Sequence, residues 1–371
     1  MKNIRFALRG ITLLLSMAIL CGLLCLFVVG TGSESAATAG AVTANISDRF
    51  DDFVNNASAE ALDGIMPIKK VYRLDRRNPV APEPNQSLFG ETDDPAVVLA
   101  LLEEAAELID GQEMQWTPET KLLPGSKLQY YYDETILVLT WKEVVNWAVY
   151  TFSEVKIADP SQLRRYRADN TFGSSIQYAT SDMATTVNAV VAINGDFYKF
   201  RSLGMVVYDS QVRRIAGEIV DSCCFDSNGD MHFVHQGEIL DEAAAQSYVE
   251  ENDILFSVAF GPIMVENGVN VTPGNYVFGE INDIYARAAI CQTDPLHYLL
   301  VTVNHEGGYS NCATVNEVGA ELARRGVDMA YTLDGGQTAT IVMNDKVINS
   351  VEFGSQRNIS DIIYFATALP G

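Results

Sequence analysis

Four short stretches of this sequence combine polar or charged side chains with the apolar runs that are typical of strands. They are NGDFY at residues 194–198, RAAI at 287–290, LDGGQTAT at 333–340 and RNISD at 357–361. In the first and third, glycines adjoin the polar residues, so the backbone could approach a ligand closely. Carboxylates in such turns could act as a nucleophile or base, and arginines could hold an anion through paired hydrogen bonds.

The charge of the chain argues against two classes of function. The 371 residues include 25 Lys and Arg against 48 Asp and Glu, which gives a formal net charge of −23. A protein that binds nucleic acid, or that docks on anionic lipid through a basic patch, would be expected to carry positive charge. The hydrophobic content of 48% with 20% charged residues indicates a globular chain rather than a disordered one.

Residues 11–30 form a nearly unbroken apolar run that follows the basic residues Lys2, Arg5 and Arg9. At 1.5 Å per residue, such a helix would match the roughly 30 Å hydrocarbon core of a bilayer. We interpret residues 1–30 as a signal-anchor that leaves the body of a single-pass protein outside the cell membrane. A signal peptide cleaved near residues 37–39 and a buried core helix are the alternatives.

Four cysteines lie beyond this segment, at Cys223, Cys224, Cys291 and Cys312. Export permits disulfides, and four cysteines allow three pairings that the sequence cannot distinguish. Free buried thiols are the alternative. Since there is no CxxC motif and no Cys/His cluster, no structural zinc site is expected.

The remaining sequence predicts an α+β fold: a strand-rich mixed sheet with few helices. Residues 31–46, rich in Ala, Ser, Thr and Gly, are expected to form a linker. Residues 47–126 are predicted to form an N-terminal region with one helix, which begins after Asp94. Residues 127–371 contain many short β-branched and aromatic stretches, so they are predicted to form the strand-rich domain.

The best-defined helix is predicted at residues 314–325. Thr314 and Glu317 form a capping box at its start, and Gly326 follows its end. Strands are predicted on both sides, so the simplest interpretation is a parallel, right-handed strand–helix–strand unit. Its two strands would end at the same sheet edge, which places the loops at 305–309 and 334–338 near each other.

Taken in order and at these separations, the motifs resemble those of the phosphodiester glycosidase family. That family includes the lysosomal uncovering enzyme and many exported bacterial proteins. The resemblance covers about residues 149–365 and also includes FGP at 260–262 and RNISDIIYF at 357–365. It implies a hydrolase that breaks a sugar-1-phosphodiester bond, between an anomeric carbon and phosphate, in extracellular or cell-envelope glycan. This sequence departs from the family pattern at two positions, because it has Gln337 and Cys291 where relatives usually carry glycine.

The resemblance implies a site with a carboxylate at an oxocarbenium-like centre and donors for a phosphate. Asp334 is the first choice for the carboxylate and Asp196 the second. His305 and Glu306, in the neighbouring loop, are candidates for proton transfer. The expected substrate-binding residues are Asn194, Gly195, Arg287, Gly335, Gly336, Thr338 and Arg357. For each residue the alternative is a structural role in a turn or ion pair. No cofactor is expected, and the sequence leaves a divalent metal open.

A non-catalytic glycan-binding module in envelope or exopolysaccharide assembly is the rival hypothesis, with Gln337 and Cys291 marking a lost active site. Both hypotheses predict a carbohydrate phosphodiester and the membrane as partners, and no nucleic acid. Only the enzyme would release free sugar.

Overall fold

The computed structural model describes residues 72–371, except residues 174, 197, 200, 217 and 218. Residues Val71–Gly371 form one compact unit. The predicted signal-anchor at 1–30 and the linker at 31–46 lie outside the described residues. Within the described part of the chain, no helix has the length and apolar character needed to cross a membrane.

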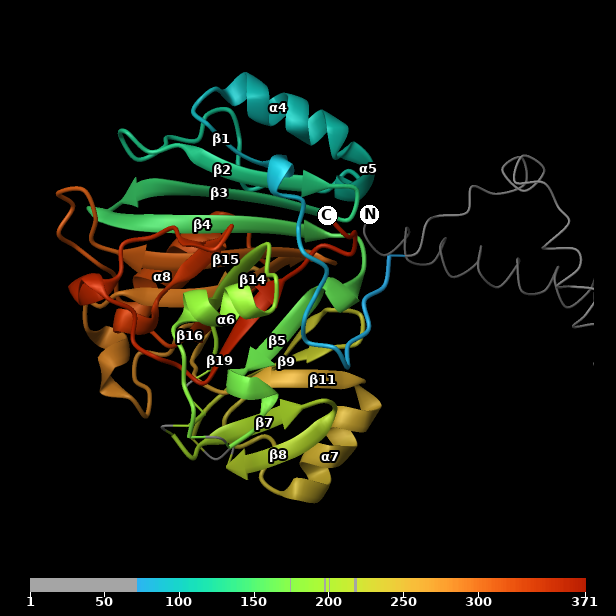
Figure 1. Cartoon of the computed structure of the whole chain (residues 1–371). Coiled ribbons are helices and arrows are strands. Elements are labelled where there is room, and N and C mark those ends of the chain that lie inside the picture. Colours follow the sequence, from blue (N-terminus) through green and yellow to red (C-terminus); the bar gives the residue numbers. More distant parts are fainter. Residues whose placement is uncertain (1–71, 174, 197, 200, 217–218) are drawn as a thin grey trace, which may run out of the picture. The chain divides into compact units, whose positions relative to one another are not determined.

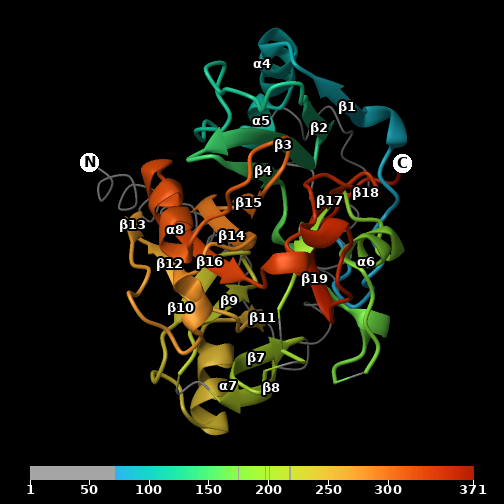
Figure 2. The ribbon, with the colours of Figure 1, turned by 90° about the vertical axis from the view of Figure 1, so that its left-hand side faces the viewer.

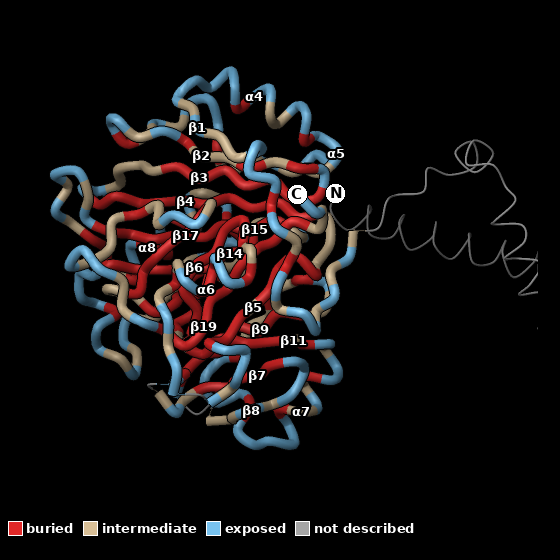
Figure 3. The backbone as a smooth tube through the Cα atoms, viewed as in Figure 1, coloured by how far each residue is buried: buried red, intermediate tan, exposed pale blue. Residues whose placement is uncertain are grey.

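The main element is a nine-stranded sheet with the order β1-β2-β3-β4-β15-β14-β16-β12-β13 (Figure 1). Its strands, in chain order, are β1 (Phe89–Thr92), β2 (Leu128–Asp133), β3 (Ile136–Val145), β4 (Ala148–Ile157), β12 (Ile263–Glu266), β13 (Val269–Asn270), β14 (Arg287–Asp294), β15 (His297–Asn304) and β16 (Met329–Leu333). All residues of β4 and β15 are buried (Figure 3), so both faces of the sheet centre are covered. Alternate residues of β4 accordingly lie in two different cores, Tyr150 and Phe152 in one and Val155 and Ile157 in the other.

Two five-stranded sheets complete the strand-rich unit. One has the order β10-β9-β11-β7-β8 and the other β18-β17-β6-β19-β5. Their strands, in chain order, are β5 (Leu163–Arg167), β6 (Val191–Asn194), β7 (Gly204–Tyr208), β8 (Gln211–Ala216), β9 (Ser222–Asp226), β10 (Met231–Val234), β11 (Ile254–Val258), β17 (Ile341–Met343), β18 (Lys346–Val347) and β19 (Asp361–Phe365). Because β6 pairs with both β17 and β19, it brings the NGDFY motif beside the last two motifs of the sequence.

The described helices are few and short, as the composition of the strand-rich domain predicts. They are α4 (Pro95–Glu104), α5 (Ala106–Ile109), α6 (Thr180–Thr186), α7 (Glu242–Glu251) and α8 (Val315–Arg324), with 3-10 turns η1 (Gln86–Leu88), η2 (Pro160–Gln162), η3 (Ala168–Asn170), η4 (Gly279–Asn282), η5 (Gly336–Thr338) and η6 (Glu352–Gly354). Asp94 caps α4, and Thr314 and Glu317 form the predicted capping box of α8. Helix α6, which the sequence analysis did not predict, has no side-chain cap and packs beside β19 and β17 (Figure 2).

Contacts cross the domain boundary that the sequence suggested at residues 126 and 127. Strand β1, from the N-terminal region, pairs with β2 in the large sheet. The hydroxyl of Tyr132 donates to Glu104 O at the end of α4, at 2.8 Å. The described part of the N-terminal region is therefore packed directly on the strand-rich domain.

The strand–helix–strand unit differs in one respect from its simplest interpretation. Strands β15 and β16, which flank α8, are parallel to each other but are not neighbours, because β14 lies between them and is antiparallel to both. In the register of the sheet, Arg287 pairs with Val303 and Ala288 pairs with Leu333. The two strands therefore end at one edge of the sheet, as predicted, and we call this the site edge.

All four cysteines in the described residues are free and buried. Cys223 and Cys224 are successive residues of β9 and lie in different hydrophobic cores. Successive strand side chains point to opposite faces, so these two cannot bridge without backbone movement. The structure therefore agrees with the alternative of free buried thiols rather than with disulfides.

Candidate active site

Asp334 lies directly after β16 at the site edge and is 8% exposed. Its Oδ2 forms an ion pair with Arg357, whose side chain is 40% exposed. Burial raises the pKa of Asp334 from 3.8 to about 6, although Arg357, Thr338 and Arg201 each lower it. Desolvation of the charged form therefore outweighs the attraction of two guanidinium groups. The result is a carboxylate that titrates close to neutral pH.

The turn after Asp334 requires glycine because the backbone of the residue before β14 comes very close. A Cβ on Gly335 would lie 2.4 Å from Ala286 O, and Gly336 has a φ of +62°. Gly336 N donates to the same Ala286 O at 2.9 Å, and Thr338 Oγ1 donates to Gly335 O at 2.7 Å. These groups fix the shape of the turn, and the amide of Gly336 points at the protein rather than at a ligand.

Asn194 and Gly195 hold this turn against the neighbouring sheet. Asn194 is fully buried, donates from Nδ2 to Asp334 O at 2.8 Å and accepts at Oδ1 from Thr340 N at 3.2 Å. A Cβ on Gly195 would meet the Asp361 carboxyl group at 2.7 Å. Asn194, predicted to bind a sugar hydroxyl, instead uses its side chain to position the backbone of Asp334.

Replacing Asn194 with alanine is expected to destabilise the protein by roughly 1–3 kcal/mol, because it leaves two buried backbone groups without their partner. The change in the midpoint of urea unfolding would measure this. The matched control is Gln246→Ala, which removes an amide bonded to Glu250 at the surface and should shift the midpoint far less. Equal midpoints for both variants would contradict the positioning role.

Arg287, predicted to bind phosphate, uses its guanidinium group on backbone carbonyls. Nε donates to Ala313 O at 3.0 Å, and Nη2 donates to Glu280 O at 2.7 Å and Asp283 O at 2.5 Å. The side chain is buried, and burial lowers its pKa. Arg287 therefore ties the segment before β14 to the loop after β15, and the structure gives it a scaffolding place.

Arg201 is a second arginine near Asp334, and the sequence analysis did not identify it. Its guanidinium carbon lies 3.3 Å from the ring centroid of Phe278 and 4.7 Å from that of Phe260. It acts on the Asp334 carboxyl strongly enough to lower that pKa. Its only signal in the sequence is its position shortly after the NGDFY motif, because Arg201 itself belongs to no recognisable motif.

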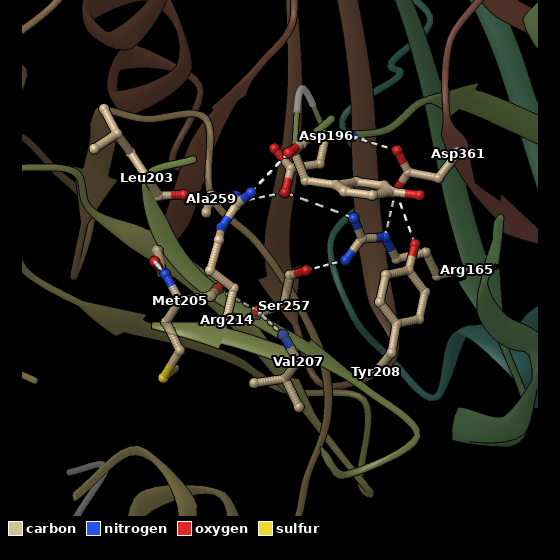
Figure 4. Close-up of polar contacts among 12 residues, drawn as sticks. Arg165, Asp196, Leu203, Met205, Val207, Tyr208, Arg214, Ser257, Ala259 and Asp361 are labelled. Carbon is tan, nitrogen blue, oxygen red and sulfur yellow. Dashed lines mark hydrogen bonds and ion pairs between the residues drawn. The ribbon is translucent and has the colours of Figure 1, made fainter. Parts of the chain in front are cut away.

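Asp196 belongs to a separate buried cluster, which is drawn in Figure 4 with Arg165, Asp361 and Tyr208. Asp196 Oδ2 accepts from Ala259 N at 2.9 Å and lies 3.6 Å from Arg165 Nη2. Arg165 also pairs with Asp361, and Tyr208 OH donates to Asp361 Oδ2 at 3.1 Å. Burial and the nearby Asp196 carboxylate raise the pKa of Asp361, while Arg165 opposes this. These contacts give Asp196 a structural position.

His305 and Glu306 lie in the loop after β15, at the same edge but with partners of their own. His305 is exposed, with Nδ1 3.1 Å from Cys312 Sγ. Glu306 forms an ion pair with Lys142 and accepts from Ser350 N at 3.2 Å.

The predicted proximity of the two loops is confirmed through Asn349. Its Nδ2 donates to Asn304 Oδ1 at 3.0 Å and to Ala339 O at 2.8 Å, so it bridges the ends of the two loops. Of the predicted site residues, Asn194, Gly195, Asp334, Gly335, Gly336, Thr338 and Arg357 are thus brought together. Asp196 and Arg287 adjoin them through the backbone, and His305 and Glu306 lie one loop away.

Comparison with known proteins identifies the region that carries these residues. Residues 187–366 match the family described as phosphodiester glycosidase. We call residues 187–366 the phosphodiester glycosidase domain, after the family that they match. The resemblance predicted from the motifs is confirmed, and the matched region contains every predicted site residue.

Individual relatives are distant. The SPbeta prophage-derived uncharacterized protein YomE of Bacillus subtilis is 24% identical over 204 residues, which cover 52% of this chain and 30% of that protein. The chain therefore spans about a third of the length of that relative. A hypothetical protein from Synechocystis shares the fold, with a TM-score of 0.51 at 14% identity over 65% of this chain and 64% of that one.

A second solved structure is the catalytic domain of zebrafish N-acetylglucosamine-1-phosphodiester alpha-N-acetylglucosaminidase, auto-inhibited by its pro-peptide. It is 17% identical and has a TM-score of 0.49, with 62% of this chain and 83% of that chain covered.

The phosphodiester glycosidase domain contains no evident cluster of metal ligands in its described residues. No three or more His, Cys, Asp or Glu side chains there are grouped so that they could hold a metal ion. The site offers one carboxylate with a raised pKa, Asp334, which forms an ion pair with Arg357 and also feels the charge of Arg201. Such an arrangement can stabilise a positive centre with the carboxylate and hold an anion with the guanidinium groups.

Proposed function

We propose that the phosphodiester glycosidase domain hydrolyses the bond between the anomeric carbon and the phosphate oxygen of a sugar-1-phosphodiester. The observation that carries the proposal is the position of Asp334. It lies within the matched family region, at the site edge, with a pKa raised to about 6, an ion pair to Arg357 and the charge of Arg201 acting on it. The family supplies the class of reaction, and this carboxylate supplies the chemistry.

Asp334 acts in this proposal as the nucleophile, or as the base that activates water, at an oxocarbenium-like centre. A phosphodiester is a good leaving group, so little help is needed from a general acid. Arg357 is partly exposed and can exchange part of its contact with Asp334 for a substrate phosphate. Arg201 is the second candidate for the phosphate. Arg287 is assigned a scaffolding role, because three carbonyls engage its guanidinium group.

The remaining predicted residues shape the site. Gly335, Gly336 and Thr338 set the turn, and Asn194 fixes the backbone of Asp334. The remaining site residues are placed differently: Gly195 packs against β19, Asp196 belongs to the buried cluster, and His305 and Glu306 lie at the periphery.

The two departures from the family pattern leave the Asp334–Arg357 pair intact. Cys291 is fully buried in β14 and packs in the hydrophobic core. The Gln337 side chain reaches Ser355 O at 3.4 Å, on the exposed side of the turn. These contacts favour the enzyme over the non-catalytic glycan-binding module.

Release of reducing sugar from a panel of sugar-1-phosphodiesters tests the proposal. The full-length protein should release sugar from at least one substrate, and the assay should be run with and without a chelator to determine whether a metal takes part. Binding of the panel without any release would instead support the glycan-binding module.

Activity is expected to fall as the pH drops through about 6, because Asp334 must be ionised to act and its pKa is raised to about 6. The pH profile of kcat/KM should show this acidic limb in the free enzyme. An unperturbed carboxylate would instead place the limb near pH 4. A profile that stays flat from pH 7 down to 5 would contradict the assignment of Asp334.

We also propose that residues 11–30 anchor the protein in the cell membrane with the domain outside, acting on cell-envelope or exopolysaccharide glycan. The support is the length of the apolar run and the basic residues before it. Protease added to intact cells should digest the domain, and protection from protease would contradict this orientation.

A further inference from the structure

Two aromatic side chains stand out among the described residues. Trp147 is 72% exposed and Phe353 is 84% exposed, more than any other large hydrophobic residue described. Both have positive φ angles, 65° and 57°. Bulky residues rarely adopt this left-handed conformation, and the other described non-glycine residues that do are Asp, Asn or Ser, apart from Leu296. The fold thus holds two exposed aromatic rings on a backbone conformation that does not favour them.

Trp147 lies in the turn between β3 and β4, and this turn is fixed to the site edge. Asn311, from the loop after β15, donates from its backbone N to Trp147 O at 3.3 Å and from Nδ2 to Asn146 O at 3.3 Å. The rings of Trp147 and Tyr309 have centroids 6.0 Å apart. Hydrogen bonds therefore hold the exposed indole beside the loop that contains His305 and Glu306.

A hollow of about 450 Å³ is lined by Tyr309, the ring that Trp147 contacts. Its lining combines Tyr309 and Ile348 with polar side chains that include Gln129, Lys142 and Glu306. Sites for small molecules usually measure about 300–1,000 Å³ and pair aromatic walls with a few polar groups. A sugar ring fits such a lining, because it presents an apolar face to an aromatic ring and hydroxyls to amide, ammonium and carboxylate groups.

A short segment connects this hollow to Asp334. Ile348 lines the hollow, and Ser350 N donates to Glu306 Oε2 at 3.2 Å. The segment then enters η6, which contains Phe353 and packs against η5, the turn that follows Asp334. Glu352 Oε2 would lie 3.2 Å from a Cβ on Gly336. The second exposed ring thus belongs to the segment between the hollow and the carboxylate.

We propose that the domain binds a glycan chain of at least two sugar units along the site edge, with a distal unit at Trp147, Tyr309 and the hollow, and Phe353 on the path to Asp334. This inference rests on the proposed function, which decides that the glycan runs from the hollow toward Asp334. It names the substrate class as an oligosaccharide rather than a single sugar. The distal subsite itself needs no chemistry at Asp334.

The test is binding of the full-length protein to an array of immobilised glycans of one to six sugar units. Trp147→Gly and Trp147→Asn both suit a φ of 65°, so both should fold and have a Tm equal to or above that of the parent. Each should weaken binding to the retained oligosaccharides at least about tenfold, as expected for loss of an aromatic anchor. Val269→Ala, which shortens an exposed side chain of β13, the last strand in the order of the large sheet, should bind as the parent does.

Three outcomes would overturn the proposal: no glycan retained by the parent, equal binding by the parent and the Trp147 variants, or single sugars retained as strongly as their oligomers. Tryptophan-dependent binding without any release of sugar would contradict the proposed function and leave the distal subsite standing.

Discussion

Asp334→Asn is expected to lower the rate of sugar release by about 10²–10⁴-fold and, at the same time, to stabilise the protein at neutral pH. Activity falls because asparagine can act neither as a nucleophile nor as a base. Stability rises because the ionised carboxylate is buried at 8% exposure and its pKa lies at about 6 rather than 3.8. The same residue would thus serve catalysis at a cost to folding.

The pH dependence of that stability follows from linkage. A folded-state pKa above the unfolded value means that the unfolded chain loses its proton first, so stability falls as the pH rises from about 4 through 6. Asparagine does not titrate, so the variant escapes this loss. The gain should be roughly 1–3 kcal/mol at pH 7 and should vanish near pH 4.

Urea unfolding at several pH values, together with the rate assay, measures both effects. Asp93→Asn is the matched control, because Asp93 is an exposed carboxylate outside the site edge. It should change neither activity nor the pH dependence of unfolding. Full activity in Asp334→Asn, or a stability gain that is the same at pH 4 and pH 7, would refute the role of Asp334.

Arg165→Met is expected to destabilise the protein by about 3–5 kcal/mol, the largest loss of stability that we predict for a single substitution. The Arg165 side chain is 1% exposed, and its partners Asp196 and Asp361 are both fully buried. Arg165 pairs with both carboxylates, so this substitution removes a cation that the two share in a medium of low dielectric constant. The loss should shrink as the pH falls, because burial and the nearby Asp196 raise the pKa of Asp361, and protonation of Asp361 relieves the repulsion between the two carboxylates.

The control is Arg77→Met. Arg77 also pairs with an aspartate, Asp75, but the two side chains are 91% and 55% exposed. Exposed pairs contribute about 0–1 kcal/mol, so this variant should unfold almost as the parent does. Chemical unfolding of both variants makes the comparison, and a loss below about 1 kcal/mol in Arg165→Met would show that the buried ion pairs of Arg165 do not stabilise the fold.

Local features of the fold were predictable because their signals are local. The caps at Asp94 and at Thr314 with Glu317 depend on residues within one helical turn of each other. The insertion of β14 between β15 and β16 was not predictable in the same way, because strand order is decided by pairing between distant segments. The prediction that β15 and β16 end at the same edge is still correct, because both strands are antiparallel to β14.

The candidate site was predictable in its residues more than in their roles. Polar side chains beside strand sequence marked Asn194 and Arg287, but the sequence cannot show whether such a side chain contacts a ligand or a backbone carbonyl. In the structure both contact the backbone. Arg201 and Arg165 carried no motif, because their importance lies in burial beside carboxylates from other segments. Whether a side chain contacts a ligand or the protein therefore depends on how distant segments pack together, which the residue types alone do not show.

The central claim is that the domain cleaves the C–O bond of a sugar-1-phosphodiester. The most direct measurement is hydrolysis in H₂¹⁸O, followed by mass spectrometry of the phosphomonoester product. The phosphomonoester should contain no ¹⁸O, because water or Asp334 attacks the anomeric carbon and the phosphate keeps its own oxygens. One ¹⁸O atom in the phosphomonoester would mean attack at phosphorus and would exclude the proposed cleavage of the C–O bond.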